Sequence, residues 1–548
     1  MGGEWAGEFD VVVVGSGAAG LTAAVTAAAR GRRTLLVEKS RFWGGTTAYS
    51  GGGVWIPANP LMQADGAGDS LEEGLRYLDA IIDDVGPASS HERRLAFLEQ
   101  GPKLVEQLTG LGFRWQRTER YPDYYPQRPG GRIGRSLEGR VVDGRVLGPF
   151  LATMRRPAGT AIPVQSRDLD LLVHAGRSPR GALQAARVLA RAAAFRGTGR
   201  VPLAAGGSLV GQLMAIGRRL AVSVQLGSPL RSLVVEGGRV TGVELERDGR
   251  HERVRANLGV VLTAGGFARN DELRRRYQPV GEQWSSASRA DQGDAIEAGV
   301  AVGAATALMD EAWWGPSFVT EAARTFCLWE RSLPGAIIVD RTAKRFVNES
   351  ASYVDVGRAI LDRDRVAPAI PSWLILDGDH RRRYLFGSVP PRITPRALLD
   401  SGLLIRAESL EELARRTELD EPVLRETIER FNGYAARGVD EEFGRGGNAY
   451  DNYYGDPRVH PNPNLGPIRN PPFWAARLYP GDLGTKGGLL TDERARVLDE
   501  SGAAIPGLYA AGNTTASVMG RTYPGPGGTL GPAMVFAQLA ALDLTSWE

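Results

Sequence analysis

The feature that most constrains the fold is a strand, a glycine-rich turn and a helix, in that order, near the start of the chain. In residues 10–14 (DVVVV) four valines follow one another, which is typical of a parallel strand buried on both faces. The turn has the GxGxxG spacing at Gly15, Gly17 and Gly20, and the alanine-rich residues 18–30 predict a helix. The glycines provide a tight turn, a close approach of the backbone to a pyrophosphate, and close packing of helix on strand. The segment therefore predicts a dinucleotide site.

A second apolar strand is predicted at residues 34–37 and ends at Glu38. An acidic side chain at this point accepts hydrogen bonds from the ribose hydroxyls and disfavours a 2′-phosphate. The N-terminus of the preceding helix directs free N–H groups and the positive end of its dipole at the phosphates. These residues alone leave both FAD and NAD open as the dinucleotide.

The composition fits a large globular protein and argues against several other classes. The 548 residues exceed what one hydrophobic core usually supports, so we expect two domains. The net charge of +3 rests on scattered arginines and gives no support to nucleic-acid binding. Cys327 is the single cysteine, and neither a disulfide nor a metal site is expected. Without a signal-peptide pattern or a run of about 18 apolar residues, we expect a cytoplasmic protein that does not span a membrane.

Three further segments favour FAD, bound without a covalent link. Residues 44–47 (GGTT), 259–267 (GVVLTAGGF) and 507–513 (GLYAAGN) resemble, in this order, segments of the succinate dehydrogenase and fumarate reductase flavoprotein superfamily. No histidine precedes the turn at 44–47, which argues against covalent attachment of the flavin there. The residues expected to contact FAD are Gly15, Gly17, Ala18, Ala19, Gly20, Glu38, Lys39, Gly44, Gly45, Thr46, Thr47, Ser50, Gly51, Gly52, Ala264, Gly265, Gly512, Asn513, Gly528 and Leu530.

The fold class that follows is α/β, with a Rossmann-like FAD-binding domain assembled from both ends of the chain and an inserted α+β catalytic domain. We expect residues 1–310 and 481–548 to form the FAD-binding domain and residues 311–480 to form the catalytic domain. An insertion is expected around residues 151–201. Residues 233–246 (LVVEGGRVTGVELE) predict a β-hairpin.

Further motifs are spread over nearly the whole chain outside the insertion. They are 50–57 (SGGGVWIP), 121–126 (YPDYYP), 313–316 (WWGP), 345–349 (RFVNE), 481–488 (GDLGTKGG) and 522–528 (TYPGPGG). With these motifs the chain resembles the 3-ketosteroid Δ1-dehydrogenases. The resemblance implies FAD-dependent dehydrogenation of a 3-ketosteroid in steroid catabolism, with a hydride passing from carbon 1 to flavin N5 and a proton passing from carbon 2 to a tyrosine. The acceptor that reoxidises the flavin is not identified by any of these residues.

The resemblance also implies the residues of the active site. Tyr523 and Gly527 match the pair that holds the 3-keto oxygen, and Tyr353 matches the tyrosine that removes the proton from carbon 2. Tyr124 matches the tyrosine that supports this base. Tyr125 is an alternative to Tyr124, because two adjacent tyrosines leave the register open by one residue.

The chemistry of such a reaction agrees with these residue types. Enolising a ketone acidifies the neighbouring C–H, and the developing oxyanion needs donors such as a tyrosine hydroxyl and a backbone N–H. Because the unperturbed pKa of tyrosine is about 10, a tyrosine base needs a hydrogen-bonded neighbour to share the task. Tyr523 lies in a Pro/Gly-rich turn before a helix predicted at 530–544, whose N-terminus can support a reduced, anionic flavin.

Aromatic side chains suggest where a sterol-sized substrate would lie. Trp313, Trp314, Trp329 and Phe326 are candidates for the lining of a pocket in the second domain. Core packing is an equally good interpretation for each of them.

The insertion contains a predicted amphipathic helix. One face has Arg180, Gln184, Arg187 and Arg191, and another has Leu183, Ala186 and Ala190. We interpret it as a surface helix packed on its own domain. A weak association with a membrane surface, which would place a cytoplasmic enzyme at the membrane periphery, is the alternative.

The residues leave several alternatives for the function. A dehydrogenase that acts between carbons 4 and 5 of a ketosteroid, or on a non-steroid cyclic ketone, would use similar residues. A non-catalytic flavin-binding redox protein is the alternative of another class. A fumarate reductase is disfavoured, because none of the five histidines lies in a motif that would bind a dicarboxylate.

Overall fold

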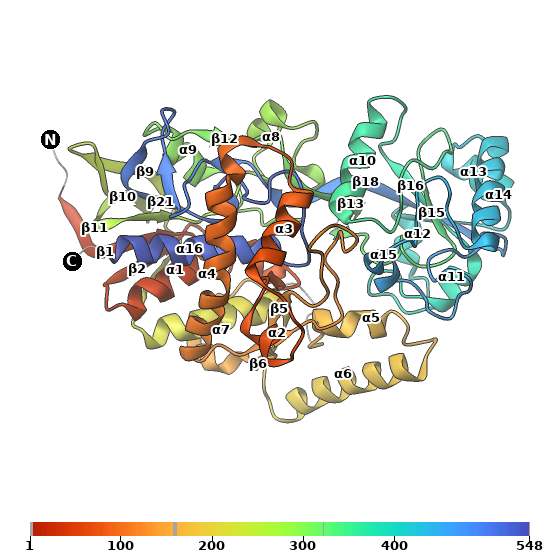
Figure 1. Ribbon diagram of the computed structural model, residues 1–548, viewed down its shortest axis with the longest axis horizontal. Coiled ribbons are helices and arrows are strands. Elements are labelled where there is room, and N and C mark those ends of the chain that lie inside the picture. Colours follow the sequence, from red (N-terminus) through yellow and green to blue (C-terminus); the bar gives the residue numbers. More distant parts are fainter. Residues whose placement is uncertain (1–3, 157–161, 322, 547–548) are drawn as a thin grey trace.

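The structure is a computed structural model that describes residues 4–156, 162–321 and 323–546. Two sheets dominate it and lie toward opposite ends of the long axis, as Figure 1 shows. The fold is the mixed α/β architecture predicted from the sequence, and strands from both ends of the chain meet in the first sheet. Residues 157–161 of the expected insertion lie outside the described residues.

The first sheet has eight strands and includes the predicted nucleotide-binding strands. Its strands are β1 (Trp5–Val14), β2 (Thr34–Glu38), β8 (Ser223–Leu226), β9 (Leu230–Glu236), β10 (Arg239–Arg247), β11 (Arg250–Leu262), β20 (Arg496–Leu498) and β21 (Ala504–Ala510). The order is β20-β21-β11-β1-β2-β8, and β9 and β10 extend the sheet from β11. β1 pairs in parallel with both β2 and β11, so the valines of β1 are buried on both faces, as a continuous apolar run predicts.

Helices α1 (Ala18–Ala29) and α16 (Leu530–Leu544) pack on this sheet, and α7 (Ala205–Arg219) packs on α1. α1 contacts both α7 and α16, and α16 also contacts α4 (His91–Gly110). The predicted strand-turn-helix unit, the hairpin of β9 and β10, and the C-terminal helix are all confirmed. The first and last helices of the FAD-binding half thus lie side by side (Figure 1).

The second sheet has antiparallel pairing throughout its named strands. These are β13 (Ala312–Val319), β14 (Arg324–Phe326), β15 (Ala336–Val339), β16 (Ser372–Leu376), β17 (Leu404–Ala407) and β18 (Phe473–Thr485). Nearby helices are α10 (Tyr353–Asp364), α11 (Gly378–Arg383), α12 (Arg396–Asp400), α13 (Leu410–Thr417), α14 (Glu421–Arg437) and α15 (Ala449–Tyr453). β18 pairs with β13, β16 and β17. It runs through the boundary expected at residue 480, so one strand connects the two halves of the protein.

Short elements complete the fold. The strands are β3 (Val54–Trp55), β4 (Trp115–Arg117), β5 (Ser136–Gly139), β6 (Val142–Asp143), β7 (Pro202–Leu203), β12 (Thr306–Ala307) and β19 (Gly488–Leu489). The helices are α2 (Pro60–Ala64), α3 (Leu71–Ile81), α8 (Asp271–Tyr277) and α9 (Asp294–Val300). β3 and β5 pair beside the segment that carries Tyr124, which brings this early part of the chain to the second sheet.

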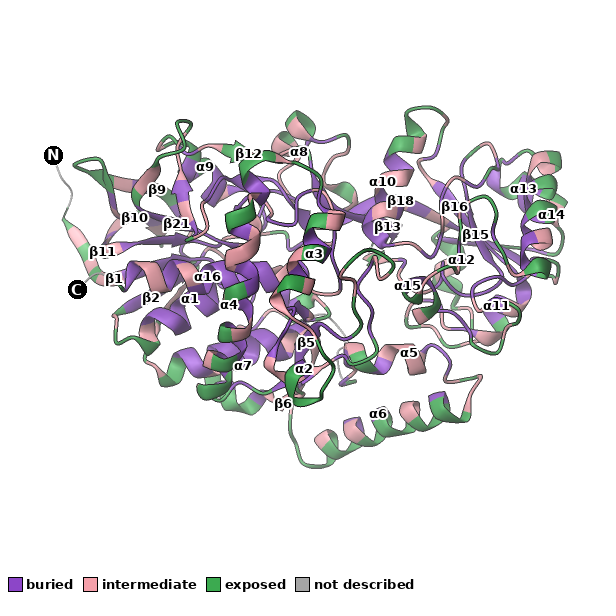
Figure 2. Cartoon of the chain, viewed as in Figure 1, coloured by how far each residue is buried: buried purple, intermediate pink, exposed green. Residues whose placement is uncertain are grey.

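The insertion forms α5 (Leu169–Leu172) and the long helix α6 (Pro179–Gly197) along one edge of the molecule, where Figure 2 shows most of α6 exposed. The amphipathic helix is confirmed, and it packs on its own domain through the buried residues Gly181, Val188 and Ala192. Leu183 is 52% exposed and Leu189 is 60% exposed. Gln184 donates to Asp168 at 2.7 Å and Arg191 forms a 3.2 Å ion pair with the same carboxylate. Leu183 and Leu189 therefore lie on the outward side of α6, whereas the buried Val188 and Ala192 and the polar contacts to Asp168 attach the other side to the domain.

Candidate functional site

The glycine-rich turn connects β1 to α1, and its backbone approaches other main-chain segments closely. Gly15 has φ +106°, and a Cβ on it would lie 2.4 Å from the carbonyl oxygen of Thr263. A Cβ on Gly20 would lie 1.8 Å from the carbonyl oxygen of Gly15. The nearest heavy atom to a Cβ on Gly17, in contrast, is the Thr47 hydroxyl at 3.5 Å. Packing inside the protein thus requires Gly15 and Gly20, whereas Gly17 leaves the N-terminus of α1 open to an approaching phosphate.

Glu38 ends β2 directly beside this turn. Its Oε2 accepts hydrogen bonds from the Ser16 backbone N–H at 3.3 Å and the Ser16 hydroxyl at 2.5 Å, and its Oε1 accepts from the Ser40 N–H at 3.0 Å. The next residue, Lys39, forms a 2.6 Å ion pair with Asp294 at the start of α9. A fixed carboxylate at the end of the second strand is the group that binds ribose hydroxyls in dinucleotide folds.

The turn at residues 44–47 packs against the glycine-rich turn. A Cβ on Gly45, which has φ +54°, would lie 3.4 Å from the Cα of Gly17. The Thr47 hydroxyl accepts a hydrogen bond from the Ala18 backbone N–H at 3.2 Å, in the first turn of α1. The two segments expected to bind phosphate therefore form one continuous surface, with Gly44 and Thr46 on the second of them.

Ser50 is engaged within its own turn. Its hydroxyl donates to the Thr47 carbonyl oxygen at 2.8 Å and accepts from the Gly52 N–H at 3.1 Å. Gly52 has φ +69°, and a Cβ on it would lie 2.4 Å from the carbonyl carbon of Ala205. The residues 50–52 thus fix the approach of this turn to α7, and Gly51 lies between them.

Segments from the middle and the end of the chain close over α1. A Cβ on Gly512 would lie 3.3 Å from the Cβ of Ala19, and the Thr514 hydroxyl donates to the Gly265 carbonyl oxygen at 2.8 Å. The residues after β11, Ala264 and Gly265, are thereby tied to the segment after β21. A small cavity beside them is lined by Arg93, Trp313, Gly512, Asn513, Thr515, Ser517, Val518, Gly528, Thr529, Pro532, Ala533 and Phe536. It lies at the N-terminal end of α16, which begins at Leu530.

Asp291 shows that these segments fit a polar cofactor. Its Oδ1 is buried and has no hydrogen-bond partner among the described residues, and it would lie 2.4 Å from a Cβ on Gly265. Burial raises the pKa of Asp291 to about 7, with the nearby Asp482 raising it further. A hydrogen bond from the Gly266 backbone N–H lowers this pKa in part, so only one carboxyl oxygen lacks a partner among the described residues. A buried oxygen of this kind beside the Gly265 turn suits a polar cofactor. The sequence had not identified Asp291 or Asp294, since neither lies in a recognised motif.

Three tyrosines from distant parts of the chain form one buried aromatic cluster. The ring centroids of Tyr124 and Tyr353 are 5.5 Å apart, those of Tyr353 and Tyr523 are 5.3 Å apart, and those of Tyr124 and Tyr523 are 5.2 Å apart. Tyr353 starts α10, and Tyr523 precedes α16 in the turn that carries Gly527. The structure therefore places all three tyrosines of the resemblance at one point.

The hydroxyl of Tyr523 lies beside the Gly527 backbone. Burial raises the pKa of Tyr523, and the neighbouring Thr529 and Tyr353 hydroxyls and the Gly527 N–H lower it in part. Gly527 has φ +100°, and a Cβ on it would lie 2.4 Å from the Gly53 carbonyl carbon. A protonated phenol and an amide N–H thus meet where a carbonyl oxygen could accept from both.

The neighbouring tyrosines influence the ionisation of Tyr353. Burial raises its pKa well above 10, interaction with Tyr523 raises it further, and a hydrogen bond from Tyr124 lowers it. Burial also raises the pKa of Tyr124 well above its usual value. A nearby phenol that donates to the Tyr353 oxygen is the arrangement that allows a tyrosine to accept a proton.

Tyr125 points away from this cluster. Its hydroxyl donates to Asp355 Oδ1 at 3.0 Å, and its backbone N–H donates to the Tyr77 hydroxyl at 3.1 Å. Tyr124 and Tyr125 therefore have different environments, and only the ring of Tyr124 contacts those of Tyr353 and Tyr523.

The aromatic candidates for the pocket separate into two groups. Trp313 contacts Tyr523 edge-on with centroids 4.9 Å apart, and Phe326 contacts Tyr353 edge-on at 5.5 Å. Trp314 lies instead under the Arg274 guanidinium, 5.3 Å from its ring centroid, and packs in a separate cluster with Leu361. Successive side chains of β13 point to opposite faces, which explains why only one of the adjacent tryptophans reaches the tyrosines.

A buried ionic group supports the two turns that carry Tyr124 and Gly527. Asp123 Oδ1 accepts from the Trp55 indole N–H at 2.7 Å, and Asp123 Oδ2 accepts from Arg135 at 2.8 Å. The backbone N–H of Trp55 donates to the Gly527 carbonyl oxygen at 3.2 Å. The sequence did not predict this support, because Trp55, Asp123 and Arg135 come together only in the folded chain.

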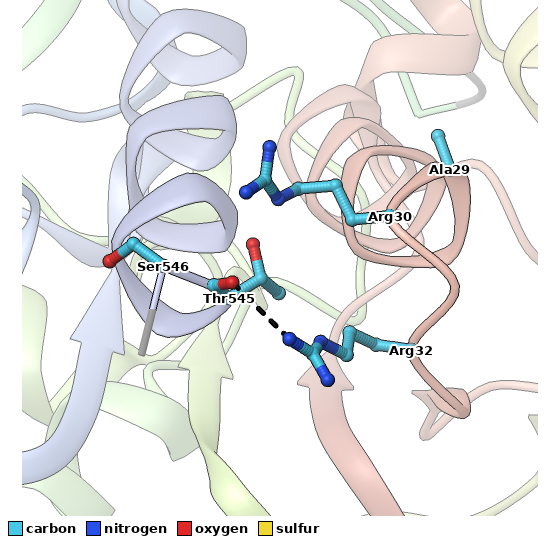
Figure 3. A pocket seen from close by; sticks show the side chains of 5 residues that line it. All are labelled: Ala29, Arg30, Arg32, Thr545 and Ser546. Atoms are coloured by element: carbon cyan, nitrogen blue, oxygen red, sulfur yellow. Dashed lines mark hydrogen bonds between the residues drawn. The ribbon is translucent and has the colours of Figure 1, made fainter. Parts of the chain in front are cut away.

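The cavity shown in Figure 3 lies elsewhere. It is lined by Ala29, Arg30, Arg32, Thr545 and Ser546. These residues lie at the C-terminal ends of α1 and α16, whereas the glycine-rich turn and the tyrosine cluster lie at the N-terminal ends. None of the candidate site residues borders this cavity.

The fold and the site together define an FAD-binding flavoprotein. The model of the family described as FAD binding domain matches residues 10–530. The 3-oxosteroid 1-dehydrogenase of Mycolicibacterium smegmatis is 44% identical over 98% of this chain and 97% of its own length. The 4-oxocyclohex-2-ene-1-carboxylate 5-dehydrogenase of Sinomonas cyclohexanicum is 35% identical over 98% of this chain and 93% of its own length.

A solved structure agrees with these relatives. The 3-ketosteroid Δ1-dehydrogenase from Sterolibacterium denitrificans, in complex with 1,4-androstadiene-3,17-dione, is 40% identical and superposes with a TM-score of 0.93, covering 99% of this chain and 100% of its own. The chain belongs to the FAD-binding family and, within it, to the 3-oxosteroid 1-dehydrogenases. The predicted resemblance and the prediction of FAD as the cofactor are therefore confirmed.

Proposed function

We propose that this enzyme introduces a double bond between carbons 1 and 2 of a 3-ketosteroid. The observation that carries the proposal is the convergence of Tyr124, Tyr353 and Tyr523 on one buried point beside the Gly527 N–H. The relatives named 3-oxosteroid 1-dehydrogenase support the substrate class and the position of the new bond.

The protein groups divide the chemistry among them. FAD supplies the two-electron acceptor that removal of two hydrogens from a C–C bond requires. The Tyr523 hydroxyl and the Gly527 N–H donate to the 3-keto oxygen and stabilise negative charge there as the ketone enolises. Tyr353 accepts the proton from carbon 2, and Tyr124 donates to the Tyr353 oxygen, which makes that phenolate less unfavourable. Trp313 and Phe326 pack against this group and exclude water from it.

The position of the double bond is tested with a substrate whose A ring is saturated. A 5α-3-ketosteroid offered with an artificial electron acceptor should yield the 1-ene product. A product that carries only a 4,5-double bond would overturn the assignment in favour of the 4,5-dehydrogenase. Identification of the product by mass and NMR spectra distinguishes the two.

A second candidate is a dehydrogenase of a non-steroid cyclic ketone. The observation that favours it is the 35% identical relative named for 4-oxocyclohex-2-ene-1-carboxylate. The comparison of kcat/KM for 4-androstene-3,17-dione with that for a 4-oxocyclohexanecarboxylate decides between the two. A higher kcat/KM for the carboxylate would show that the enzyme acts on this second substrate class and not on steroids.

The residues that bind FAD are also part of the proposal. The glycine-rich turn, Glu38 and the turn at 44–47 provide the phosphate and ribose contacts, and Gly512, Asn513 and the start of α16 close over the flavin. We infer the domain division from the same sheets, with residues 1–310 and 481–548 around the first sheet and residues 311–480 around the second. Isolated residues 311–480 that bind FAD by themselves would contradict this division.

The exposed face of α6 supports a weak contact with a membrane surface, with the enzyme placed on the cytoplasmic side. α6 contains arginines and no acidic residue, and its exposed apolar residues Leu183 and Leu189 lie outward. No helix among the described residues is long and apolar enough to cross a bilayer. The wild type should sediment with vesicles of anionic lipid, whereas the double variant Leu183→Ser/Leu189→Ser should stay in the supernatant. Equal sedimentation of both proteins would exclude this contact. The acceptor that reoxidises the flavin is not specified by these residues.

A further inference from the structure

Lys486 is a fully buried lysine close to the tyrosine cluster. It follows β18, its relative exposure is 0%, and no carboxylate forms an ion pair with it among the described residues. Removing an ammonium group from water without a direct counter-ion destabilises the folded protein. A methionine of similar length would fill the same space without this cost. A lysine at this position therefore points to a role other than stability.

The contacts of Lys486 lead to the residue that holds the keto oxygen. Its Nζ donates to the Thr522 carbonyl oxygen at 2.7 Å, which fixes the peptide bond immediately before Tyr523. The same Nζ lies 4.4 Å from the centroid of the Trp313 ring. Trp313 in turn presses edge-on against the Tyr523 ring. One ammonium group thus restrains Tyr523 through its main chain and through its ring.

Trp313 also connects Lys486 to the segment expected to close over the flavin. The Trp313 indole N–H donates to Asn513 Oδ1 at 3.2 Å, and the Ser517 N–H donates to the Lys486 carbonyl oxygen at 3.0 Å. Lys486 therefore lies between the Asn513 segment and the Tyr523 turn. Movement of either segment would break a contact to this one residue.

Burial and nearby charged groups both act on the Lys486 amine. Burial lowers the pKa of Lys486 well below its ordinary value, and the carboxylates of Glu311 and Asp355 counteract this in part. Asp355 is also the acceptor of the Tyr125 hydroxyl. The hydrogen bond to the Thr522 carbonyl oxygen and the contact with the Trp313 ring both stabilise the amine, and both hold it at this position.

We propose that Lys486 is a positioning residue for the dehydrogenation, which holds the Tyr523 hydroxyl in register with the keto oxygen through Thr522 and Trp313. This inference rests on the proposed function, because it concerns the residue that stabilises the enolate. Misplacement of such a donor by about 1 Å lowers the rate about 100-fold. Loss of Lys486 should therefore affect the transition state more than the binding of the ground-state ketone.

The test compares Lys486→Met, Lys486→Gln and Lys486→Arg in the FAD-loaded enzyme with 4-androstene-3,17-dione and an artificial electron acceptor. Lys344→Met, which alters an exposed lysine, is the matched control. We expect kcat to fall about 30- to 100-fold in Lys486→Met, with KM changed less than threefold and the melting temperature unchanged or higher. Lys486→Arg, which keeps a cation and a donor, should recover activity above both other variants, and Lys344→Met should match the wild type.

The outcomes separate the inference from the function on which it rests. A Lys486→Met enzyme with wild-type kcat overturns the inference alone. A fall in kcat that accompanies a large loss of melting temperature, with no recovery in Lys486→Arg, assigns Lys486 a structural role and also overturns it. A wild type that does not oxidise any 3-ketosteroid overturns the proposed function and this inference with it.

Discussion

The ring of Tyr124 stacks on the ring of Tyr523, with centroids 5.2 Å apart and planes 17° apart. The Tyr124 backbone N–H also donates to the Pro524 carbonyl oxygen at 3.0 Å. The segments that carry Tyr124 and Tyr523 are therefore locked together, although they come from distant parts of the sequence. In the proposed mechanism, this contact would keep the residue that supports the base in a fixed position relative to the residue that holds the keto oxygen.

Removal of the Tyr523 hydroxyl should abolish most turnover without loss of the cofactor. Tyr523→Phe removes one of two donors at the developing oxyanion, and a loss of about 100- to 1000-fold in kcat is expected. Bound flavin, measured by its absorbance, should equal that of the wild type. Tyr434→Phe on α14, far from the cluster, is the control and should keep full activity. Unaltered turnover in Tyr523→Phe would favour a flavin-binding redox protein without this catalytic role.

The adjacent tyrosines provide an internal comparison. Tyr124→Phe removes the donor to Tyr353 and should lower kcat about 10- to 100-fold. Tyr125→Phe loses the bond to Asp355 and should lower the melting temperature while kcat stays within about threefold. Steady-state kinetics and thermal unfolding of both variants measure this. The reverse order of effects on kcat would exchange the roles of Tyr124 and Tyr125.

The pH dependence of the reaction should report the ionisation of Tyr353. Because burial raises the pKa of Tyr353 well above 10, the resting residue is protonated at neutral pH, and the fraction able to accept a proton increases with pH. The pKa of Tyr523 is also raised, so Tyr523 stays protonated and can donate over the same range. We expect kcat/KM to rise between about pH 6 and pH 9 without a plateau. A plateau below about pH 8 in the wild type, or the same slope in Tyr353→Phe, would rule out this base.

Substitution in the second phosphate turn should weaken FAD binding. Gly45→Ala forces a side chain onto a residue with φ +54° and places its Cβ 3.4 Å from Gly17. Gly237→Ala in the β9–β10 hairpin imposes similar backbone strain at φ +58° but has no atom within 4 Å of the new Cβ. Both variants should lose about 1 kcal/mol of stability. Only Gly45→Ala should show a higher Kd for FAD in titrations of the apoprotein. Equal FAD affinity in the two variants would indicate that the phosphates do not bind at this turn.

Much of the cofactor half could be predicted from the sequence, because its signals are local. Consecutive valines, glycines at fixed spacing and an acidic residue at the end of the next strand each reflect contacts within about 30 residues, and β1, α1 and β2 follow them. The hairpin of β9 and β10 was likewise encoded by alternation around Gly237 and Gly238, both of which have positive φ. The roles predicted for Tyr124 and Tyr353 rested on the resemblance, since no local pattern distinguishes them from packed tyrosines, whereas Tyr523 also stood out by its Pro/Gly-rich turn before a helix.

The support of the site could not be predicted, because it depends on contacts between distant segments. The Asp123–Arg135 pair, the buried Asp291 and the buried Lys486 involve residue types that are normally exposed. The contacts of Gln184 and Arg191 on α6 with Asp168 were likewise not predicted, because Asp168 lies in a different element of the insertion. Lys486 lies within a motif, GDLGTKGG, that was identified only by its resemblance.

The central claim is tested most directly by anaerobic addition of 4-androstene-3,17-dione to the FAD-loaded enzyme. The account predicts bleaching of the oxidised flavin absorbance, with one equivalent of 1,4-androstadiene-3,17-dione formed for each flavin reduced. In Tyr523→Phe the same bleaching should be slower by about 100-fold or more. A flavin that stays oxidised in the wild type, or that is bleached without formation of the 1,4-diene, would contradict the account.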